Sequence, residues 1–231
     1  MKPLYIIPAR GGSKGIPHKN IRPLAGRPLL HHTIAAALDA GADRTRILVS
    51  TDDPAIADCA RAAGIDVPFM RPAELATDTA GSREVMLHAL DWADALGIGY
   101  DCAVLLQPTS PLRSAADING ALALYAASAD CDMVVSVTEA RANPYYDCFE
   151  VDPDTGTLHV SKGDGHYTRR QDAPAAWQYN GAVYVIRPES LRAMPMGAFP
   201  RRIPYPMPAD RSVDIDTPLD WLVAEALLQG V

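Results

Sequence analysis

Residues 8–20 read Pro-Ala-Arg-Gly-Gly-Ser-Lys-Gly-Ile-Pro-His-Lys-Asn and lie between segments of different periodicity. Before them, the continuous apolar run 4–7 predicts a short buried strand. After them, apolar residues recur at the spacing of one helix face, at Leu30, Ile34, Ala37 and Leu38. A strand, a glycine-rich loop and a helix are therefore expected in this order.

The loop combines three glycines with three cations, Arg10, Lys14 and Lys19. Glycines let backbone N–H groups approach an anion closely, and the cations supply the charge that a polyphosphate needs. This composition favours an anion-binding loop over a plain connector. Neither familiar nucleotide motif fits, because Ile16 stands where a Walker A loop needs its second glycine and Ser13 where a dinucleotide-binding loop does.

Outward from the loop, predicted strands and helices alternate along the chain. Further strands are predicted at 46–50, 67–70, 102–106, 132–137 and 183–186, with helices at 54–63, 82–96 and 114–128. A closing helix is expected to pack through Leu219, Leu222, Val223, Ala226 and Leu227. This alternation predicts an α/β fold, with a mostly parallel Rossmann-like sheet and helices on both faces. Ligands bind such sheets at the carboxyl ends of the strands, where the loops 8–20, 71–82 and 107–113 would open.

The alternation breaks at residues 139–179. Turn signals at 143–146 and 152–156 predict strands and loops that project from the sheet, and a solvent-exposed excursion without a role is the alternative. The rest of the chain returns to the α/β pattern. We therefore expect one domain, 1–231, with an inserted segment at about 139–179.

Two acidic residues follow near the end of the chain, in Asp214-Ile215-Asp216. Strand alternation would direct both carboxylates to one face and Ile215 into the core. Two carboxylates on one face repel each other unless a cation lies between them, and oxygen ligands beside phosphates suit Mg²⁺. The alternative is that Asp216 only assists the start of a helix, with Thr217 as its N-cap.

Composition limits the partners and the location. The formal charge of −7 argues against nucleic acid or an anionic membrane as the general partner. No stretch is long and apolar enough to span a bilayer, and the first residues lack the core of a signal peptide, so a cytoplasmic location is expected. The four cysteines are irregularly spaced and predict free thiols rather than zinc ligands or disulfides.

Five segments carry a resemblance to the acylneuraminate cytidylyltransferases, which make CMP-sialic acid and related CMP-nonulosonic acids. They occur in that family's order over nearly the whole chain. The segments are Ile-Pro-Ala-Arg-Gly-Gly-Ser-Lys-Gly at 7–15 with Lys-Asn at 19–20, Arg-Pro-Ala-Glu-Leu-Ala at 71–76, Leu-Gln-Pro-Thr-Ser-Pro-Leu-Arg at 106–113, Asn-Gly-Ala-Val-Tyr at 180–184 and Asp-Ile-Asp-Thr at 214–217. The resemblance implies a fold of the nucleotide-diphospho-sugar transferase type, in which the inserted segment is a dimerisation arm.

The resemblance also implies the reaction, in which CMP passes from CTP to an acidic nine-carbon sugar and pyrophosphate is released. Arg10, Lys19 and Asp216 would be catalytic, and Asp214 and Asp216 would hold Mg²⁺. The nucleotide would be bound by Ala9, Arg10, Gly12, Ser13, Lys14, Lys19, Asn20, Arg71 and Ser82. Gln107 would contact the sugar, and Arg170 of a homodimer partner would add a cation.

Each of these roles has a plainer alternative. Arg71 could lie at a strand end with its charge in water, Gln107 could satisfy loop backbone, and Arg170 could be a solvated charge. For the whole chain, the alternatives are a nucleotidyltransferase that uses another base or a sugar phosphate, and a nucleotide-sensing module without catalysis.

Two positions depart from the family's pattern. Tyr146 and Gln178 stand where sialic-acid-activating relatives tend to carry basic residues. Neutral side chains make weaker hydrogen bonds to a carboxylate or a hydroxylated tail than cations do, and the ring of Tyr146 suits a methyl or acetamido group. The sequence therefore predicts a legionaminic- or pseudaminic-type sugar, unless both residues lie outside the sugar pocket.

Overall fold

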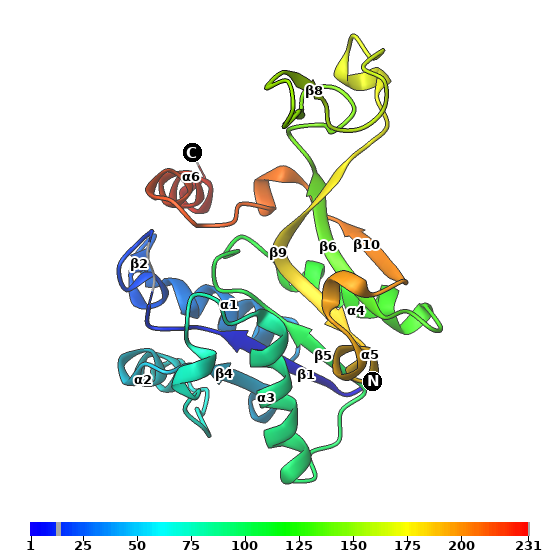
Figure 1. Ribbon diagram of the computed structural model, residues 1–231. Helices are drawn as coiled ribbons and strands as arrows, with labels where there is room; N and C mark the ends of the chain where they lie inside the picture. The colour runs from blue at the N-terminus through cyan, green and yellow to red at the C-terminus, as the bar shows by residue number, and fades with distance from the viewer. Residues whose placement is uncertain (13–14, 231) are drawn as a thin grey trace.

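The computed structural model describes residues 1–12 and 15–230. In this part of the chain the central sheet has six strands, in the order β10-β6-β9-β5-β1-β4 (Figure 1). They are β1 (Pro3–Pro8), β4 (Ile47–Ser50), β5 (Cys102–Leu105), β6 (Met133–Glu139), β9 (Trp177–Ile186) and β10 (Arg202–Pro206). β9 runs antiparallel to both of its neighbours, and the other pairs are parallel. The predicted mostly parallel α/β sheet is confirmed.

Alternating side chains of the strands divide the core into two layers. Tyr5 and Ile7 of β1 pack with α1 (Leu29–Asp39), α2 (Pro54–Ala62) and α4 (Ala115–Ala127). Leu4 and Ile6 of the same strand pack on the other face with α3 (Ser82–Ala95) and α5 (Pro188–Ala193). A strand that is buried on both faces is continuously apolar, which is why residues 4–7 show no polar alternation.

Local capping signals mark the starts of helices where the sequence predicts them. Asp53 accepts a hydrogen bond from the Ala55 N–H and is followed by Pro54 at the first helical position. Ser114 and Asp117 form a reciprocal capping box at α4, and Thr217 and Asp220 form another at α6 (Pro218–Gln229). No helix in the described ranges is long and apolar enough to cross a membrane.

Two predictions about these elements are wrong. Residues 67–70 form no strand, because Pro68 lacks the N–H that a ladder requires. The closing helix exists, but its predicted face is exposed, with Leu219 at 68% and Leu222 at 63% exposure. α6 instead packs through Trp221 and Ala224, in a small third cluster with Ile16, Leu24, Leu29 and Ile215.

The inserted segment leaves the sheet after β6 and returns through β9, projecting from one end of the sheet (Figure 1). β9 pairs with the end of β6 through Trp177 opposite Glu139 and Gln178 opposite Thr138. Beyond this pair lies an antiparallel hairpin of β7 (Phe149–Val151) and β8 (Leu158–Val160). A second short hairpin, β2 (Pro23–Leu24) with β3 (Arg27–Pro28), precedes α1.

Candidate active site

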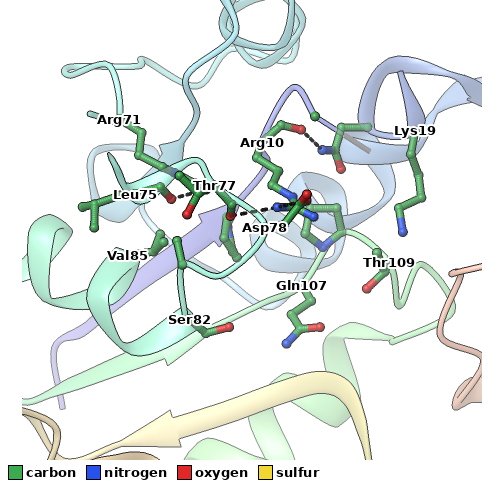
Figure 2. A pocket seen from close by; sticks show the side chains of 15 residues that line it. Arg10, Lys19, Arg71, Leu75, Thr77, Asp78, Ser82, Val85, Gln107 and Thr109 are labelled. Atoms are coloured by element: carbon green, nitrogen blue, oxygen red, sulfur yellow. Dashed lines mark hydrogen bonds and ion pairs between the residues drawn. The ribbon is translucent and has the colours of Figure 1, made fainter. Parts of the chain in front are cut away.

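A cavity of about 270 Å³ opens among the three loops that the sequence predicts at the carboxyl ends of the strands (Figure 2). The structure brings together seven of the predicted site residues along its lining: Arg10, Gly12, Lys19, Asn20, Arg71, Ser82 and Gln107. Ala9 lies fully buried beneath the glycine-rich loop. Ser13 and Lys14 lie outside the described residues.

The glycine-rich loop is held by contacts to β4, to the segment after it and to the acidic segment. The Ala9 N–H donates to the Ser50 carbonyl at 2.9 Å, and the Gly11 N–H donates to Asp52 Oδ1 at 3.0 Å. A Cβ atom on Gly15 would clash with the Asp216 carbonyl oxygen. Glycine is therefore required at position 15 so that the loop can approach the acidic segment.

Arg10 links the glycine-rich loop to the loop at 71–82. Its guanidinium donates to the Thr77 carbonyl at 2.9 Å and pairs with Asp78 Oδ1 at 3.0 Å (Figure 2). The Asn20 side chain supports it from below by donating to the Arg10 carbonyl at 2.9 Å. The pair between Arg10 and Asp78 is half exposed, so a phosphate entering the cavity could replace this carboxylate as a partner of the arginine.

Arg71 is buried rather than snorkelling at a strand end. Its Nε donates to Ser50 Oγ at 3.0 Å, and its terminal nitrogens donate to the carbonyls of Ser50 and Leu75. Burial lowers the pKa of Arg71 to about 10, although the charge of Asp52 opposes this effect. A guanidinium has five N–H donors, so three bonds to the chain leave two for a ligand. Ser82, the first residue of α3, lines the same side of the cavity.

Lys19 joins the cavity to the acidic segment. Its Nζ donates to the Ile215 carbonyl at 2.6 Å and lies 3.3 Å from Asp216 Oδ1. Thr109, next to Gln107 in the cavity lining, accepts from the Ile215 N–H at 2.8 Å and hydrogen-bonds the Asp214 carboxyl. The glycine-rich loop, the loop at 107–113 and the two aspartates therefore lie next to one another.

The two aspartates are not equivalent. Residues 214–216 form no strand, contrary to the prediction. The backbone of Ile215 makes one hydrogen bond to Thr109 and one to the Lys19 side chain, rather than the repeated backbone hydrogen bonds of a β-ladder. Ile215 is buried as predicted, and Asp216 is 74% exposed. Burial, and after it the charge of Asp216, raises the pKa of Asp214 against the opposing effects of Thr109, Lys19 and Arg113.

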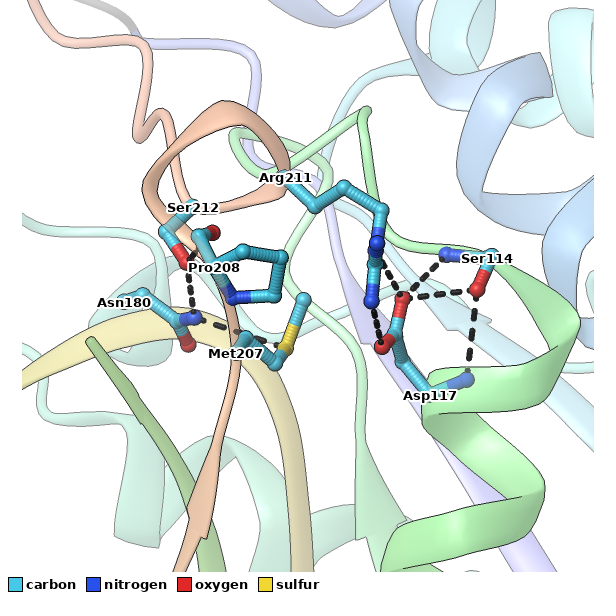
Figure 3. A network of polar contacts seen from close by, with 7 residues as sticks. All are labelled: Ser114, Asp117, Asn180, Met207, Pro208, Arg211 and Ser212. Atoms are coloured by element: carbon cyan, nitrogen blue, oxygen red, sulfur yellow. Dashed lines mark hydrogen bonds and ion pairs between the residues drawn. The ribbon is translucent and has the colours of Figure 1, made fainter.

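The residues just before the acidic segment are tied to the sheet and to α4 (Figure 3). Arg211 makes two bonds of 3.1 Å to the Asp117 carboxylate, which also belongs to the capping box of α4. Ser212 Oγ accepts from the Asn180 side chain at 2.9 Å. These contacts fix the position from which the chain continues to Asp214.

Three predicted sugar contacts do not line the cavity of their own chain. Tyr146 and Arg170 lie on the projecting arm, where Arg170 pairs with Asp147, and Gln178 is exposed on β9. Conversely, Thr109, Thr77 and Asp78 line the cavity without having been predicted. The only signal for them was their place within the loops 71–82 and 107–113.

Comparison with known proteins identifies relatives over the whole chain. The model of the Cytidylyltransferase family matches residues 4–220. A CMP-N,N'-diacetyllegionaminic acid synthase of Legionella pneumophila is 33% identical over 99% of this chain and 97% of its own length. An N-acylneuraminate cytidylyltransferase of Streptococcus agalactiae serotype III is 38% identical over 96% of this chain, which spans 52% of that relative.

A similar fold occurs in a solved structure of a CMP:2-keto-3-deoxy-manno-octonic acid synthetase complexed with CTP. It superposes with a TM-score of 0.73 at 20% identity, over 100% of this chain and 99% of that one. The family model and the full-length relative agree with the resemblance carried by the five sequence segments. The chain therefore belongs to the cytidylyltransferase family and is a nucleotidyltransferase.

Proposed function

We propose that this enzyme transfers CMP from CTP to a nonulosonic acid and releases pyrophosphate. The observation that supports it most directly is the position of Lys19, which lines the cavity and binds both Ile215 and Asp216. A cation between the glycine-rich loop and two carboxylates can stabilise the negative charge that develops on the phosphate oxygens when the triphosphate is cleaved. Relatives named as synthases of CMP-legionaminic acid and as acylneuraminate cytidylyltransferases support the choice of substrates.

In the proposed reaction, a hydroxyl oxygen of the sugar attacks the α-phosphorus of CTP. A new O–P bond forms, the bond from the α-phosphorus to the bridging oxygen breaks, and pyrophosphate leaves with that electron pair. Arg10 and Lys19 would neutralise the phosphate oxygens, and Lys14, outside the described residues, would assist. The protein contributes mainly by holding both substrates in line and by stabilising the developing charge.

The remaining cavity residues suit the ends of the two substrates. Two of the five N–H groups of Arg71 make no bond to the described residues, and Arg71 lies with Asn20 and Ser82 in the lining, where we place the nucleoside. Gln107 carries both a donor and an acceptor, so we place the sugar beside it. Nucleoside and sugar would then meet at the phosphates held by Arg10 and Lys19.

A magnesium ion is implied by the family, and the residues present fit one. No group of three His, Cys, Asp or Glu side chains gathers for a metal within residues 1–12 and 15–230. Mg²⁺ commonly uses one or two carboxylates and completes its shell with water and substrate phosphates, which the pair Asp214 and Asp216 can satisfy. When bound there, Mg²⁺ would neutralise charge on the phosphate oxygens. Lys19 contacts the Asp216 carboxylate and Thr109 hydrogen-bonds the Asp214 carboxylate, so both carboxylates are held by residues of the cavity lining.

The arm suggests how the site is completed. Three large apolar side chains of the arm are about half exposed or more in the single chain, namely Phe149 at 54%, Leu158 at 66% and Trp177 at 49%. We propose that the protein is a cytoplasmic homodimer in which the arm covers the partner's sugar site. Arg170 would then act on the partner's substrate, and Tyr146 and Gln178 would favour a legionaminic- or pseudaminic-type sugar.

The function is tested by pyrophosphate release from CTP with Mg²⁺ and a panel of nonulosonic acids. We expect turnover that requires both the sugar and the metal, with the highest kcat/KM for a legionaminic- or pseudaminic-type sugar. A preference for N-acetylneuraminic acid would overturn the sugar assignment alone. Turnover with another nucleotide, or with a sugar phosphate, would overturn the proposed reaction, as would nucleotide binding without any pyrophosphate release.

The dimer is tested by light scattering and by mixing two inactive variants. Arg170→Ala chains and Asp216→Asn chains should together regain activity when subunits exchange, because mixed dimers contain one intact site. An active monomer would contradict the proposed arm. Exchanged but inactive mixtures would contradict the role of Arg170 across the interface.

A further inference from the structure

Arg113 is a buried cation at the end of the loop that carries Gln107. Only 3% of it is exposed, and no carboxylate of the described residues lies within ion-pair distance of it. The nearby Asp117 is already paired with Arg211. Burial lowers the pKa of Arg113 to about 9, against the opposing charges of Asp214 and Asp117. A charge in such a place destabilises the fold relative to an apolar residue of the same volume.

The hydrogen bonds of Arg113 join two separate parts of the chain. One terminal nitrogen donates to Thr33 Oγ1 of α1 at 2.9 Å, and the other donates to the Gln107 carbonyl. Its Nε has no partner among the described residues. The guanidinium thus connects α1 to the backbone of Gln107, which lines the cavity, whereas Arg113 itself is not part of the lining.

The side chain of Gln107 is confined from the opposite direction. Gly181 of β9 has a φ of +70°, and a Cβ atom there would lie 2.9 Å from Gln107 Oε1 and 2.8 Å from Ser110 Oγ. Ser110 Oγ donates to the Asn180 carbonyl at 2.8 Å, which keeps the loop against β9. Figure 2 shows the Gln107 amide projecting from its loop into the space beside β9. A small shift of the Gln107 backbone would therefore displace its amide within a tight space.

We propose that Arg113 is a positioning residue for the sugar substrate, because it fixes the Gln107 backbone from behind. The inference rests on the proposed function, in which Gln107 contacts the sugar. In the proposed function the nucleotide is bound by the loops at 8–20 and 71–82, so Arg113 should affect the affinity for the sugar far more than that for CTP. A merely structural arginine would lower stability or disturb both substrates alike.

The test measures KM for CTP and for the best nonulosonic acid separately, together with Tm, in three variants. Arg113→Met removes the charge and both bonds but keeps most of the volume. Arg113→Lys keeps the charge but, without the planar fork, reaches one acceptor. Thr33→Val removes only the hydroxyl that anchors the guanidinium and would decide the matter even if Arg113→Met did not fold.

The expected result is a rise of about tenfold in the sugar KM for Arg113→Met, with the CTP KM within about twofold of the wild type. Arg113→Lys and Thr33→Val should give smaller rises, again for the sugar alone. Arg46→Met is the matched control, because Arg46 also clamps a carbonyl, that of Gly99 at 3.1 Å, far from the cavity lining. It should change neither KM.

Unchanged sugar KM in the variants that fold would overturn the role of Arg113, and so would equal rises for CTP and sugar. Either result requires a wild-type enzyme that turns over the sugar. If the wild type turns over none of the sugars, the proposed function fails and this inference fails with it. The two failures are therefore distinguished by the wild-type assay.

Discussion

Replacing Arg211 by Met tests whether the pair with Asp117 holds the segment that leads to the proposed metal ligands. The Asp117 side chain is 2% exposed and the Arg211 side chain 42%, and two bonds of 3.1 Å join them. Methionine keeps the aliphatic stem but removes both donors. The carboxylate would then keep its bonds from the Ser114 N–H and hydroxyl and lose the only ion-pair partner that it has among the described residues.

The expected loss of stability lies between two limits. Removing one partner from a fully buried pair costs roughly 3–5 kcal/mol, whereas exposed pairs contribute about 0–1 kcal/mol. Water reaches the arginine side of this pair, and Ser114 still donates to the carboxylate, so we expect a loss of about 2 kcal/mol. For a chain of this length, this corresponds to a fall in Tm of about 4–8 °C.

The pH dependence has a definite sign. Burial acts to raise the pKa of Asp117, but the bonds from Arg211 and Ser114 outweigh it and hold the pKa below its ordinary value. A lowered folded pKa gives stability that is present above the unfolded pKa and is lost as pH falls through the folded value. The loss in free energy of unfolding caused by Arg211→Met should therefore be largest near neutral pH and become smaller as Asp117 is protonated.

The assay is urea unfolding between about pH 3 and pH 7, with Arg61→Gln as the control for loss of a surface pair. Arg61 pairs with Asp58 in α2, and both side chains are exposed, so this control should lose less than about 0.5 kcal/mol. A deficit in Arg211→Met that is the same at every pH, or no larger than that of the control, would refute the reasoning.

Three further outcomes concern the acidic segment. Asp216→Asn should lower magnesium-dependent turnover at least about a hundredfold without changing Tm, because the side chain is 74% exposed; near-normal turnover would exclude it as a ligand. Lys19→Ala should lower kcat by about a hundredfold, and a change confined to the CTP KM would show that Lys19 only binds the nucleotide. Asp214→Asn should raise the Tm of the ligand-free protein above that of the wild type near neutral pH but not near pH 3, because a raised pKa of Asp214 means that stability falls as pH rises through that pKa. The same Tm difference between variant and wild type at both pH values would contradict this.

The sequence alone determined the features that depend on neighbouring residues. Caps join a side chain to a backbone group two or three positions away, so Asp53, Ser114 and Thr217 marked helix starts correctly. The alternation of apolar strands and helices determined the α/β class, since each pattern reports burial within one element. The loops at strand ends then determined where the cavity lies, although not which side chains line it.

Only the tertiary structure decided what depends on residues far apart in the chain. Lys19 binds Ile215 across a separation of 196 residues, and nothing in either local sequence specifies that contact. β9 enters the sheet antiparallel between β5 and β6, and α6 buries Trp221 rather than Leu219 and Leu222. Nothing in the local sequence marks Arg113 as buried, yet packing leaves only 3% of it exposed. The physical reason is that burial and pairing depend on which surfaces meet, whereas a local pattern specifies only what each surface offers.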